Sequence, residues 1–265
     1  MVIGESNSDM TITEGEEMIL DISSCILSVE ADYDVVRYAL FDESSSAAIL
    51  FKTCESQKEI RDDAYLKSSN DFHKVFIAQS CANYALFPLN IKEEINAAIY
   101  SSSDFIPSID ASLTYNEDSL TSQVKSMFPG AFLRHGMSSL LEGVLKRTKF
   151  LKGVRIYADV KEQLVHIVVV ANGKLLSSVS ERIDDSKDVI YHILARIEAY
   201  KLNQLEDVIC LSGNVLASGV VYTSLMKHMK DVQINKGFNY QKLISGSSEV
   251  NKQEFFTVIN SFQCG

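Results

Sequence analysis

The sequence predicts an α/β protein of two similar lobes, each with a five-stranded mixed sheet and helices packed on it. In the second half, apolar β-branched runs and amphipathic stretches follow the order strand, strand, strand, helix, strand, helix, strand. An antiparallel meander followed by βαβ crossovers forms a mixed sheet. The first half repeats this order of elements, although the two halves share negligible sequence identity. The repeat therefore predicts a first lobe over residues 1–150 and a second lobe, with a C-terminal helix, over 151–265.

The second half contains the clearest elements. Strands are predicted at 154–158, 164–170, 174–180, 208–211 and 232–234, and helices at 185–202 and 216–229. Asn172-Gly173 joins the second strand to the third, and this dipeptide favours a hairpin turn because both central residues take a positive φ. Asp185 offers a side-chain oxygen that caps the first helix.

The first half contains the same kinds of element with weaker signals. Strands are predicted at 18–20, 25–29, 35–41, 47–51, 74–79, 84–87, 110–115 and 131–133, and helices at 57–66, 91–100, 123–128 and 138–148. Asn90 is the expected cap of the second of these helices. Ser139 and Glu142 fit a capping box in the last one.

Charge and composition restrict the partners. The net charge of −10 disfavours nucleic acid and an anionic membrane as partners, unless a local basic patch compensates. The densest basic stretch, Lys146-Arg147-Thr148-Lys149 with Lys152 and Arg155, is interpreted as a solvated linker. No apolar run approaches the roughly 20 residues that span a bilayer. A globular composition, a polar stretch at 1–13 and five dispersed cysteines without a C-x-x-C pair make a soluble cytoplasmic protein the expectation.

Four stretches of the chain resemble one small uncharacterised bacterial family, a domain-of-unknown-function family with an actin-like ATPase, or ribonuclease-H-like, fold. They are Phe87-Pro88-Leu89, Gly173-Lys-Leu-Leu176, Asp188-Val-Ile-Tyr191 and Val208-Ile-Cys-Leu-Ser-Gly213. A more distant likeness is to the actin-like pilus-assembly proteins. The resemblance implies duplicated ribonuclease-H-like lobes over nearly the whole chain.

The resemblance also implies where ATP and Mg²⁺ would bind. In active members, the first phosphate loop follows the first strand and contains Asp-x-Gly, because glycine lets backbone N–H groups approach the phosphates. The matching stretch is Asp21-Ile22-Ser23-Ser24, in which Ser23 replaces the glycine. No glycine occurs between Gly15 and Gly130, so the expected loop lacks its usual backbone.

The second phosphate loop and the adenosine loop match the second half. Asp159 keeps the aspartate of the second loop, but Lys161 replaces its glycine and Glu162 would face the phosphates. Gly213 and Asn214 stand at the double glycine that packs against adenosine, and asparagine tolerates the left-handed conformation better than most residues. The expected nucleotide site is therefore degenerate.

Each candidate residue also has a structural interpretation, which we favour. Asp21 and Asp159 are common turn residues after strands because aspartate forms local hydrogen bonds. Gly213 fits a tight strand-to-helix turn. Lys161 is either a phosphate contact or a solvated turn lysine, and the second is preferred. No catalytic residue is therefore assigned.

Other chemistries have less support. The sequence lacks a Walker A motif, a G-x-G-x-x-G fingerprint and a G-x-S-x-G elbow. Its five histidines form no metal-binding pair of the H-E-x-x-H or H-x-x-x-H type, so no metal site is predicted. Glu162 and His166 share one face of the predicted hairpin, but two ligands do not make a metal site.

Two functions from different classes remain. The favoured one is a non-catalytic protein that binds an unidentified protein partner or a small ligand, without a cofactor. The alternative is a divergent Mg-dependent ATPase or kinase that uses ATP with Mg²⁺ at Asp21 and Asp159.

The C-terminus predicts a short amphipathic helix over about 252–262. Phe255, Val258, Ile259 and Phe262 form one apolar stripe at helical spacing. A helix of this length is marginal alone in water. We therefore expect it to pack on its own chain near the junction of the lobes, and the competing possibility is a partner-binding tail.

Overall fold

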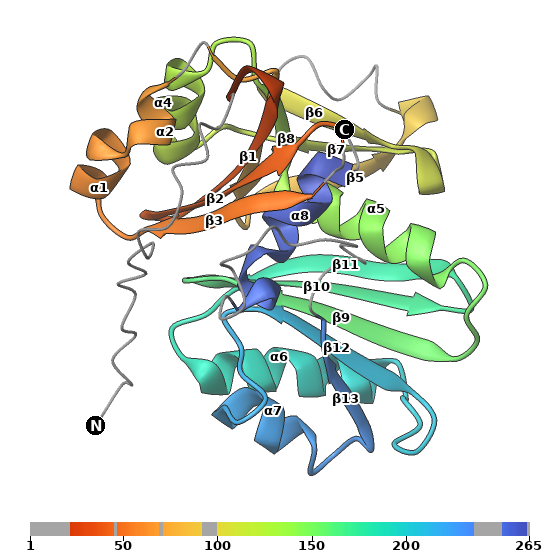
Figure 1. Cartoon of the computed structure of the whole chain (residues 1–265). Helices are drawn as coiled ribbons and strands as arrows, with labels where there is room; N and C mark the ends of the chain where they lie inside the picture. The colour runs from red at the N-terminus through yellow and green to blue at the C-terminus, as the bar shows by residue number, and fades with distance from the viewer. Residues whose placement is uncertain (1–21, 45–46, 69–70, 92–99, 236–250, 264–265) are drawn as a thin grey trace.

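The computed structural model describes residues 22–44, 47–68, 71–91, 100–235 and 251–263 (Figure 1). They form an α/β protein with two five-stranded mixed sheets and a smaller three-stranded sheet. The predicted fold class is confirmed. The strands expected at 18–20, most of the helix expected at 91–100, and Asp21 lie outside the described residues.

The first sheet has the strand order β3-β2-β1-β4-β8. Its strands are β1 (Cys25–Asp32), β2 (Val35–Asp42), β3 (Ala48–Cys54), β4 (Lys74–Ser80) and β8 (Phe132–His135). The helical segments of this part of the chain are η1 (Ile22–Ser24), α1 (Gln57–Asp62), α2 (Ala64–Lys67) and α4 (Ser119–Met127). β1 pairs antiparallel with β2 and parallel with β4. Among the described residues, the meander β1–β2–β3 therefore begins at Cys25.

The second sheet has the order β11-β10-β9-β12-β13. It contains β9 (Val154–Val160), β10 (Leu164–Ala171), β11 (Lys174–Arg182), β12 (Val208–Gly213) and β13 (Asp231–Ile234), with helices α6 (Ser186–Ala199) and α7 (Val220–Leu225). All the predicted strands are present. Asp185 caps α6 in a capping box with Asp188, and Asn172 takes the positive φ of the predicted hairpin.

A third sheet is inserted between β4 and α4. It consists of β5 (Tyr84–Pro88), β6 (Ser102–Ile106) and β7 (Ala111–Tyr115) in the order β5-β7-β6, with η2 (Leu89–Ile91) and η3 (Pro107–Ile109) between the strands. The sequence did not predict β6, because three polar residues open this short strand.

Two helices lie between the large sheets (Figure 1). Helix α5 (Gly136–Thr148) packs against β10 and β11 of the second sheet and against α8. Helix α8 (Phe256–Gln263), preceded by η4 (Lys252–Phe255), packs against β1, β2 and β4 of the first sheet. The expected packing of the C-terminal helix on its own chain is confirmed: Val258 and Ile259 pack on the first sheet, and Phe256 belongs to a core cluster with residues of the second.

The capping box predicted for α5 is wrong. The helix begins at Gly136, and His135 caps it by accepting a hydrogen bond from the backbone N–H of Met137 at 3.0 Å. Ser139 lies inside the helix and forms a buried hydrogen bond with Ser261 of α8 at 2.8 Å. Glu142 receives the backbone N–H of Ser108 at 3.3 Å, so both residues contact neighbouring elements instead of the helix start.

Among the described residues, no helix combines the length and the apolar character needed to cross a bilayer.

Candidate functional site

The hairpins β1–β2 and β9–β10 meet at the junction of the two large sheets. A hydrogen bond joins them, since the backbone N–H of Glu162 donates to the Asp32 side-chain carboxylate, at Oδ2, at 3.2 Å. Glu30 pairs with Arg37 across the first hairpin, and Asp159 pairs with His166 across the second. In each hairpin this pair lies two residues before the last residue ahead of the turn, which is Asp32 in the first and Lys161 in the second, so Glu30 and Asp159 hold equivalent positions.

Lys161 lies at the centre of this junction. Its side chain is 1% exposed, and its ammonium forms ion pairs with Glu30 Oε1 at 2.6 Å and Asp159 Oδ2 at 2.9 Å. The ammonium also donates to Thr257 Oγ1 of α8 at 2.8 Å. The expectation of a solvated turn lysine is therefore wrong: one cation joins a carboxylate of each sheet to the C-terminal helix.

The two carboxylates are held by hydroxyl groups. Ser80, at the end of β4, donates to Glu30 Oε1 at 2.7 Å. Asp159 accepts from Ser212 Oγ and from Thr257 Oγ1, both at 2.8 Å. Both oxygens of Asp159 are thus engaged by this chain.

Arg37 forms a second bridge between the hairpins. Its guanidinium contacts Asp32 Oδ2 at 3.1 Å within the first lobe and Glu162 Oε1 at 2.6 Å in the second. It also donates to Asn214 Oδ1 at 3.1 Å, and Asn214 donates to Glu162 at 2.7 Å. We call the six charged residues of this junction the interlobe ion cluster. They are Glu30, Asp32, Arg37, Asp159, Lys161 and Glu162.

Burial and charge act against each other in the cluster. Burial alone would lower the pKa of Lys161, but the carboxylates of Asp159, Glu30 and Asp32 outweigh it and raise that pKa above its ordinary value. Burial raises the pKa of Asp32 to about 6, and repulsion by Glu30 acts in the same direction. Lys161 is therefore charged at neutral pH, whereas Asp32 takes up a proton in mild acid.

A few buried polar atoms of this region have no hydrogen-bond partner among the described residues. They are Glu30 Oε2, Asp32 Oδ1, Arg37 Nε and His166 Nε2. His166 lies beside His135, with ring centroids 5.8 Å apart. Burial, followed by the charge of Lys161, lowers the pKa of His166 to about 3. Burial and His166 hold the pKa of His135 well below its usual range.

The structure places only part of the predicted nucleotide site at this junction. Asp159 and Asn214 both belong to it. Ser23 and Ser24 belong to η1, which precedes β1, so they lie at the opposite end of that strand from Glu30 and Asp32. The turn that follows the first described strand is Tyr33-Asp34. The phosphate loop expected at 21–24 thus does not follow β1.

Gly213 is required by close backbone packing. It has φ +79, and a Cβ at this position would lie 1.9 Å from the carbonyl oxygen of Val160. The N–H of Asn214 donates to that same carbonyl at 2.8 Å. This contact gives Gly213 a structural role at the end of β12.

Sequence reasoning missed Glu30 and Arg37, and also Asp32, Ser80 and Thr257. A usable signal existed for the first two, because both are charged residues inside runs that are otherwise apolar. No local signal marked Thr257, which belongs to a helix about a hundred residues away from Lys161 in the chain.

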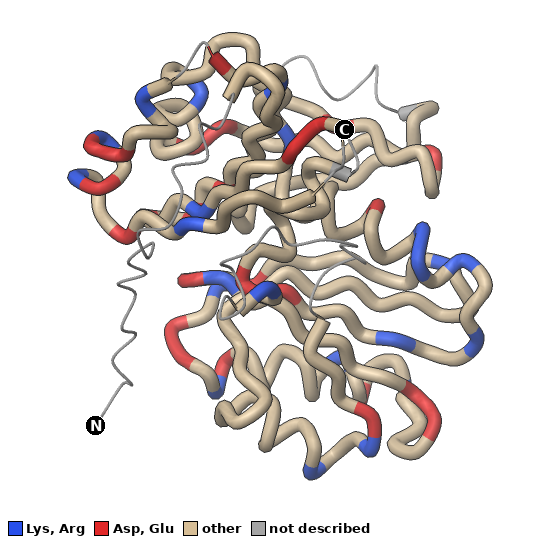
Figure 2. The backbone as a smooth tube through the Cα atoms, viewed as in Figure 1, with Lys and Arg blue, Asp and Glu red and all other residues tan. Residues whose placement is uncertain are grey.

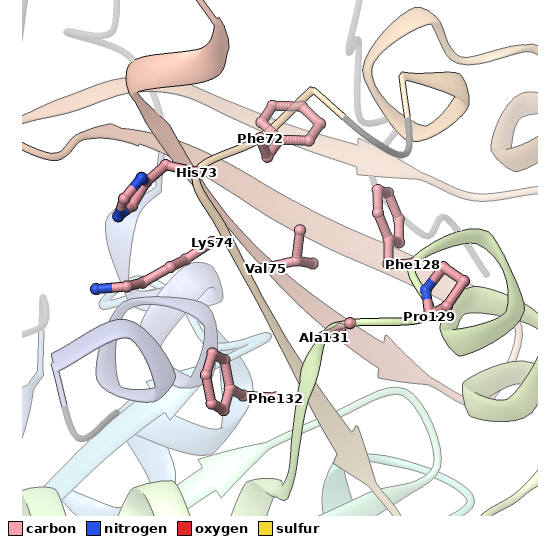
Figure 3. A pocket seen from close by; sticks show the side chains of 9 residues that line it. Phe72, His73, Lys74, Val75, Phe128, Pro129, Ala131 and Phe132 are labelled. Atoms are coloured by element: carbon pink, nitrogen blue, oxygen red, sulfur yellow. The ribbon is translucent and has the colours of Figure 1, made fainter.

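A shallow pocket lies at the other end of β4, far from the ion cluster (Figure 3). Phe72, Lys74 and Phe132 are among its lining residues, which include no carboxylate. Within the described ranges, no group of three or more His, Cys, Asp or Glu residues is arranged to hold a metal ion.

Comparison with known proteins identifies the family and the fold of this chain. The family model described as "Protein of unknown function (DUF3822)" matches residues 73–232. No curated protein sequence matches the chain. A solved protein from Bacteroides thetaiotaomicron, described as having an actin-like ATPase fold and unknown function, is similar with a TM-score of 0.69 at 16% identity, over 92% of this chain and 99% of that one.

A second solved structure, described as a PilM-PilN type IV pilus biogenesis complex, has a TM-score of 0.59 at 10% identity, over 90% of this chain and 98% of the matched one. At these identities the likeness shows the fold alone. The expected resemblance to an actin-like family of unknown function, and more distantly to pilus-assembly proteins, is confirmed.

Proposed function

This chain belongs to the DUF3822 family of proteins of unknown function and has the actin-like ATPase fold, and from that premise we propose that it is a non-catalytic binding protein. In this proposal the nucleotide position between the lobes is degenerate, and an internal cation, the Lys161 ammonium, holds the lobes together. The protein acts by binding another protein or a small ligand.

The observation that carries the proposal is the buried position of Lys161 between Glu30 and Asp159. The resemblance expects a glycine at Lys161, which would leave room for phosphate at the second loop. Instead, a four-carbon side chain fills the junction, and its charge neutralises the carboxylates that would otherwise attract Mg²⁺. The lysine thus supplies internally the positive charge that a bound metal would bring.

The comparison with PilM supports a protein partner for this chain in a limited way. That protein was solved in a complex with PilN, so this fold can serve in an assembly. The family that matches residues 73–232 is described as one of unknown function, so it does not indicate a substrate.

One observation favours the alternative, a divergent Mg-dependent ATPase or kinase. Glu30 Oε2 and Asp32 Oδ1 are buried without a hydrogen-bond partner among the described residues. Carboxylate oxygens of this kind are the ligands that Mg²⁺ prefers. In this alternative, Lys161 would have to leave its position before ATP with Mg²⁺ binds.

A nucleotide titration separates the two functions. Thermal unfolding is measured with and without millimolar ATP and Mg²⁺, because a ligand at a hundred times its Kd stabilises a protein by about 2.7 kcal/mol. We expect no shift for the natural chain. A shift that disappears in Asp159→Asn, while Asp118→Asn keeps it, would overturn the proposal and establish the alternative. Asp118 is a suitable control because its side chain caps α4 by accepting the N–H of Thr121, and it is not one of the six residues of the cluster.

A further inference from the structure

A basic, apolar-tipped turn follows helix α5 on the surface of the second lobe. The helix ends at Thr148, and the chain reaches β9 through residues 149–153. The turn is tied down by backbone hydrogen bonds, from Leu151 to Thr148 at 2.9 Å and from Asn172 to Gly153 at 3.1 Å. The Asn172 side chain accepts the N–H of Gly153 at 3.1 Å, so the β10–β11 hairpin supports the turn.

Two apolar side chains project from this turn. Phe150 is 88% exposed and Leu151 is 38% exposed. The Lys149 ammonium lies 5.6 Å from the centroid of the Phe150 ring. Neither side chain belongs to a core cluster of the described residues.

Positive charge surrounds the apolar tip. The sequence from Gly143 to Ala158 contains five basic residues and no acidic one. In Figure 2, blue segments gather at the end of α5 and along the turn into β9. Lys149, Lys152 and Lys174 form no ion pair within the described part of the chain, and Lys146 pairs at 3.3 Å with Glu142, which is itself buried. We name this surface the α5 turn patch, consisting of Lys146, Lys149, Phe150, Leu151, Lys152 and Lys174.

We propose that the α5 turn patch docks this protein on the surface of a bilayer that contains anionic phospholipid. Lysines beside a membrane surface are attracted to anionic headgroups, and phenylalanine and leucine insert at the boundary with the acyl chains. Phe150, which is 88% exposed, is free to insert between the headgroups. The repulsion from the net charge of −10 is weakened because carboxylates more than about 8 Å away are largely screened at physiological salt. The carboxylate beside the turn, Asp207, is buried and accepts the N–H of Val154 at 2.7 Å.

Vesicle sedimentation tests the electrostatic part of this inference. The full chain is mixed with neutral phosphatidylcholine vesicles and with vesicles containing phosphatidylglycerol, at low and physiological salt. We expect binding only to the anionic vesicles, weakening as salt rises. The double variant Lys149→Ala/Lys152→Ala should lower the partition coefficient roughly 30-fold. Lys227→Ala/Lys230→Ala, at two exposed lysines of the α7–β13 turn, makes the same charge change and should bind like the natural chain.

Fluorescence tests the apolar part. The sequence contains no tryptophan, so Phe150→Trp introduces a single probe at the tip of the patch. With anionic vesicles its emission should shift to shorter wavelength and should be quenched by brominated lipid. Tyr191→Trp, at a residue that is 68% exposed on α6, should show neither change.

The outcomes separate the lipid from other anionic partners. Loss of vesicle binding in the lysine variant, together with the Phe150→Trp shift, would support the inference. Absence of binding to anionic vesicles at low salt would overturn it, as would equal binding by the natural chain and the lysine variant. Lysine-dependent binding to a polyglutamate peptide or to duplex DNA, without binding to vesicles, would assign the patch to an acidic protein or nucleic acid and would also overturn it.

Discussion

The hairpins β1–β2 and β9–β10 occupy equivalent places in the two sheets, but they end in opposite charges. Glu30 and Asp159 stand at the same register position, and two residues later the chain has Asp32 in the first hairpin and Lys161 in the second. Lys161 crosses to Glu30 of the first lobe, while Arg37 crosses to Glu162 of the second. Each lobe thus gives one cation to a carboxylate of the other.

This exchange shows how a duplicated fold can hold its lobes together from within. Two carboxylates that face each other repel, and the Lys161 ammonium between Glu30 and Asp159 offsets that repulsion. Buried ion pairs of this kind add little net stability over apolar packing, but the loss of one partner leaves an unpaired charge in the interior.

The largest expected effect therefore comes from breaking the charge exchange at Lys161. Lys161→Met leaves Glu30 and Asp159 buried without their cation, and urea denaturation should show a loss of about 3–5 kcal/mol in the free energy of unfolding. Lys125→Met removes a partly exposed pair with Glu117 and should cost at most about 1 kcal/mol. An equal loss in the free energy of unfolding for the two variants would show that the buried ion pairs of Lys161 contribute no more to stability than an exposed pair.

A second effect concerns the helices that lie between the lobes, of which α8 carries Thr257 to the ion cluster. Phe262 stacks on Phe41 of β2 with ring centroids 4.5 Å apart. Because Phe262 is only half-buried, Phe262→Ala should lower the free energy of unfolding by about 2–3 kcal/mol, which is less than the roughly 3–5 kcal/mol of fully buried phenylalanines.

The control for this variant is Phe150→Ala, at the exposed turn after α5, which should change stability by less than about 0.5 kcal/mol. If the two variants had the same urea midpoint, and residues 252–262 exchanged their amide hydrogens rapidly, the packing of α8 on the first sheet would be refuted.

The two lobes also differ in how well the sequence predicted them. In the second lobe, Asn172-Gly173 and the Asp185 cap mark the ends of elements through local chemistry that the structure repeats. In the first lobe, the strand predicted at 25–29 ended at Val29, because Glu30 and Asp32 suggest a solvated turn. The structure buries both carboxylates inside the strand, so the strand is three residues longer.

The same cause limits what could be predicted of the site. A buried charge is stable only beside its partner, and the partner of Arg37 is Glu162, 125 residues away in the chain. The sequence showed that Lys161 replaces a glycine, and this indicated a degenerate loop. It could not show that Glu30 would be close enough to hold the ammonium, since that depends on how the two lobes are packed.

The smallest expected effect is a difference between the two hairpins in how they make the free energy of unfolding depend on pH. His166 of β10 faces Asp159, as Arg37 of β2 faces Glu30, but it is buried beside Lys161 and its pKa falls from 6.5 to about 3. Below pH 6.5 the unfolded chain binds a proton that the folded chain rejects, so His166 makes the protein less stable as pH falls toward 3. Asp32 acts in the opposite direction, since burial raises its pKa from 3.8 to about 6 and folding then favours its protonated form.

Urea denaturation at pH 7.5 and 5.5 tests the contribution of His166. His166→Phe should remove about 1.4 kcal/mol of the stability that the natural chain loses through this histidine between the two pH values. His228→Phe, at an exposed histidine after α7, should leave the pH dependence unchanged. An identical pH dependence in the His166→Phe variant and the natural chain would mean that His166 can be protonated in the folded state, with its ring in contact with water.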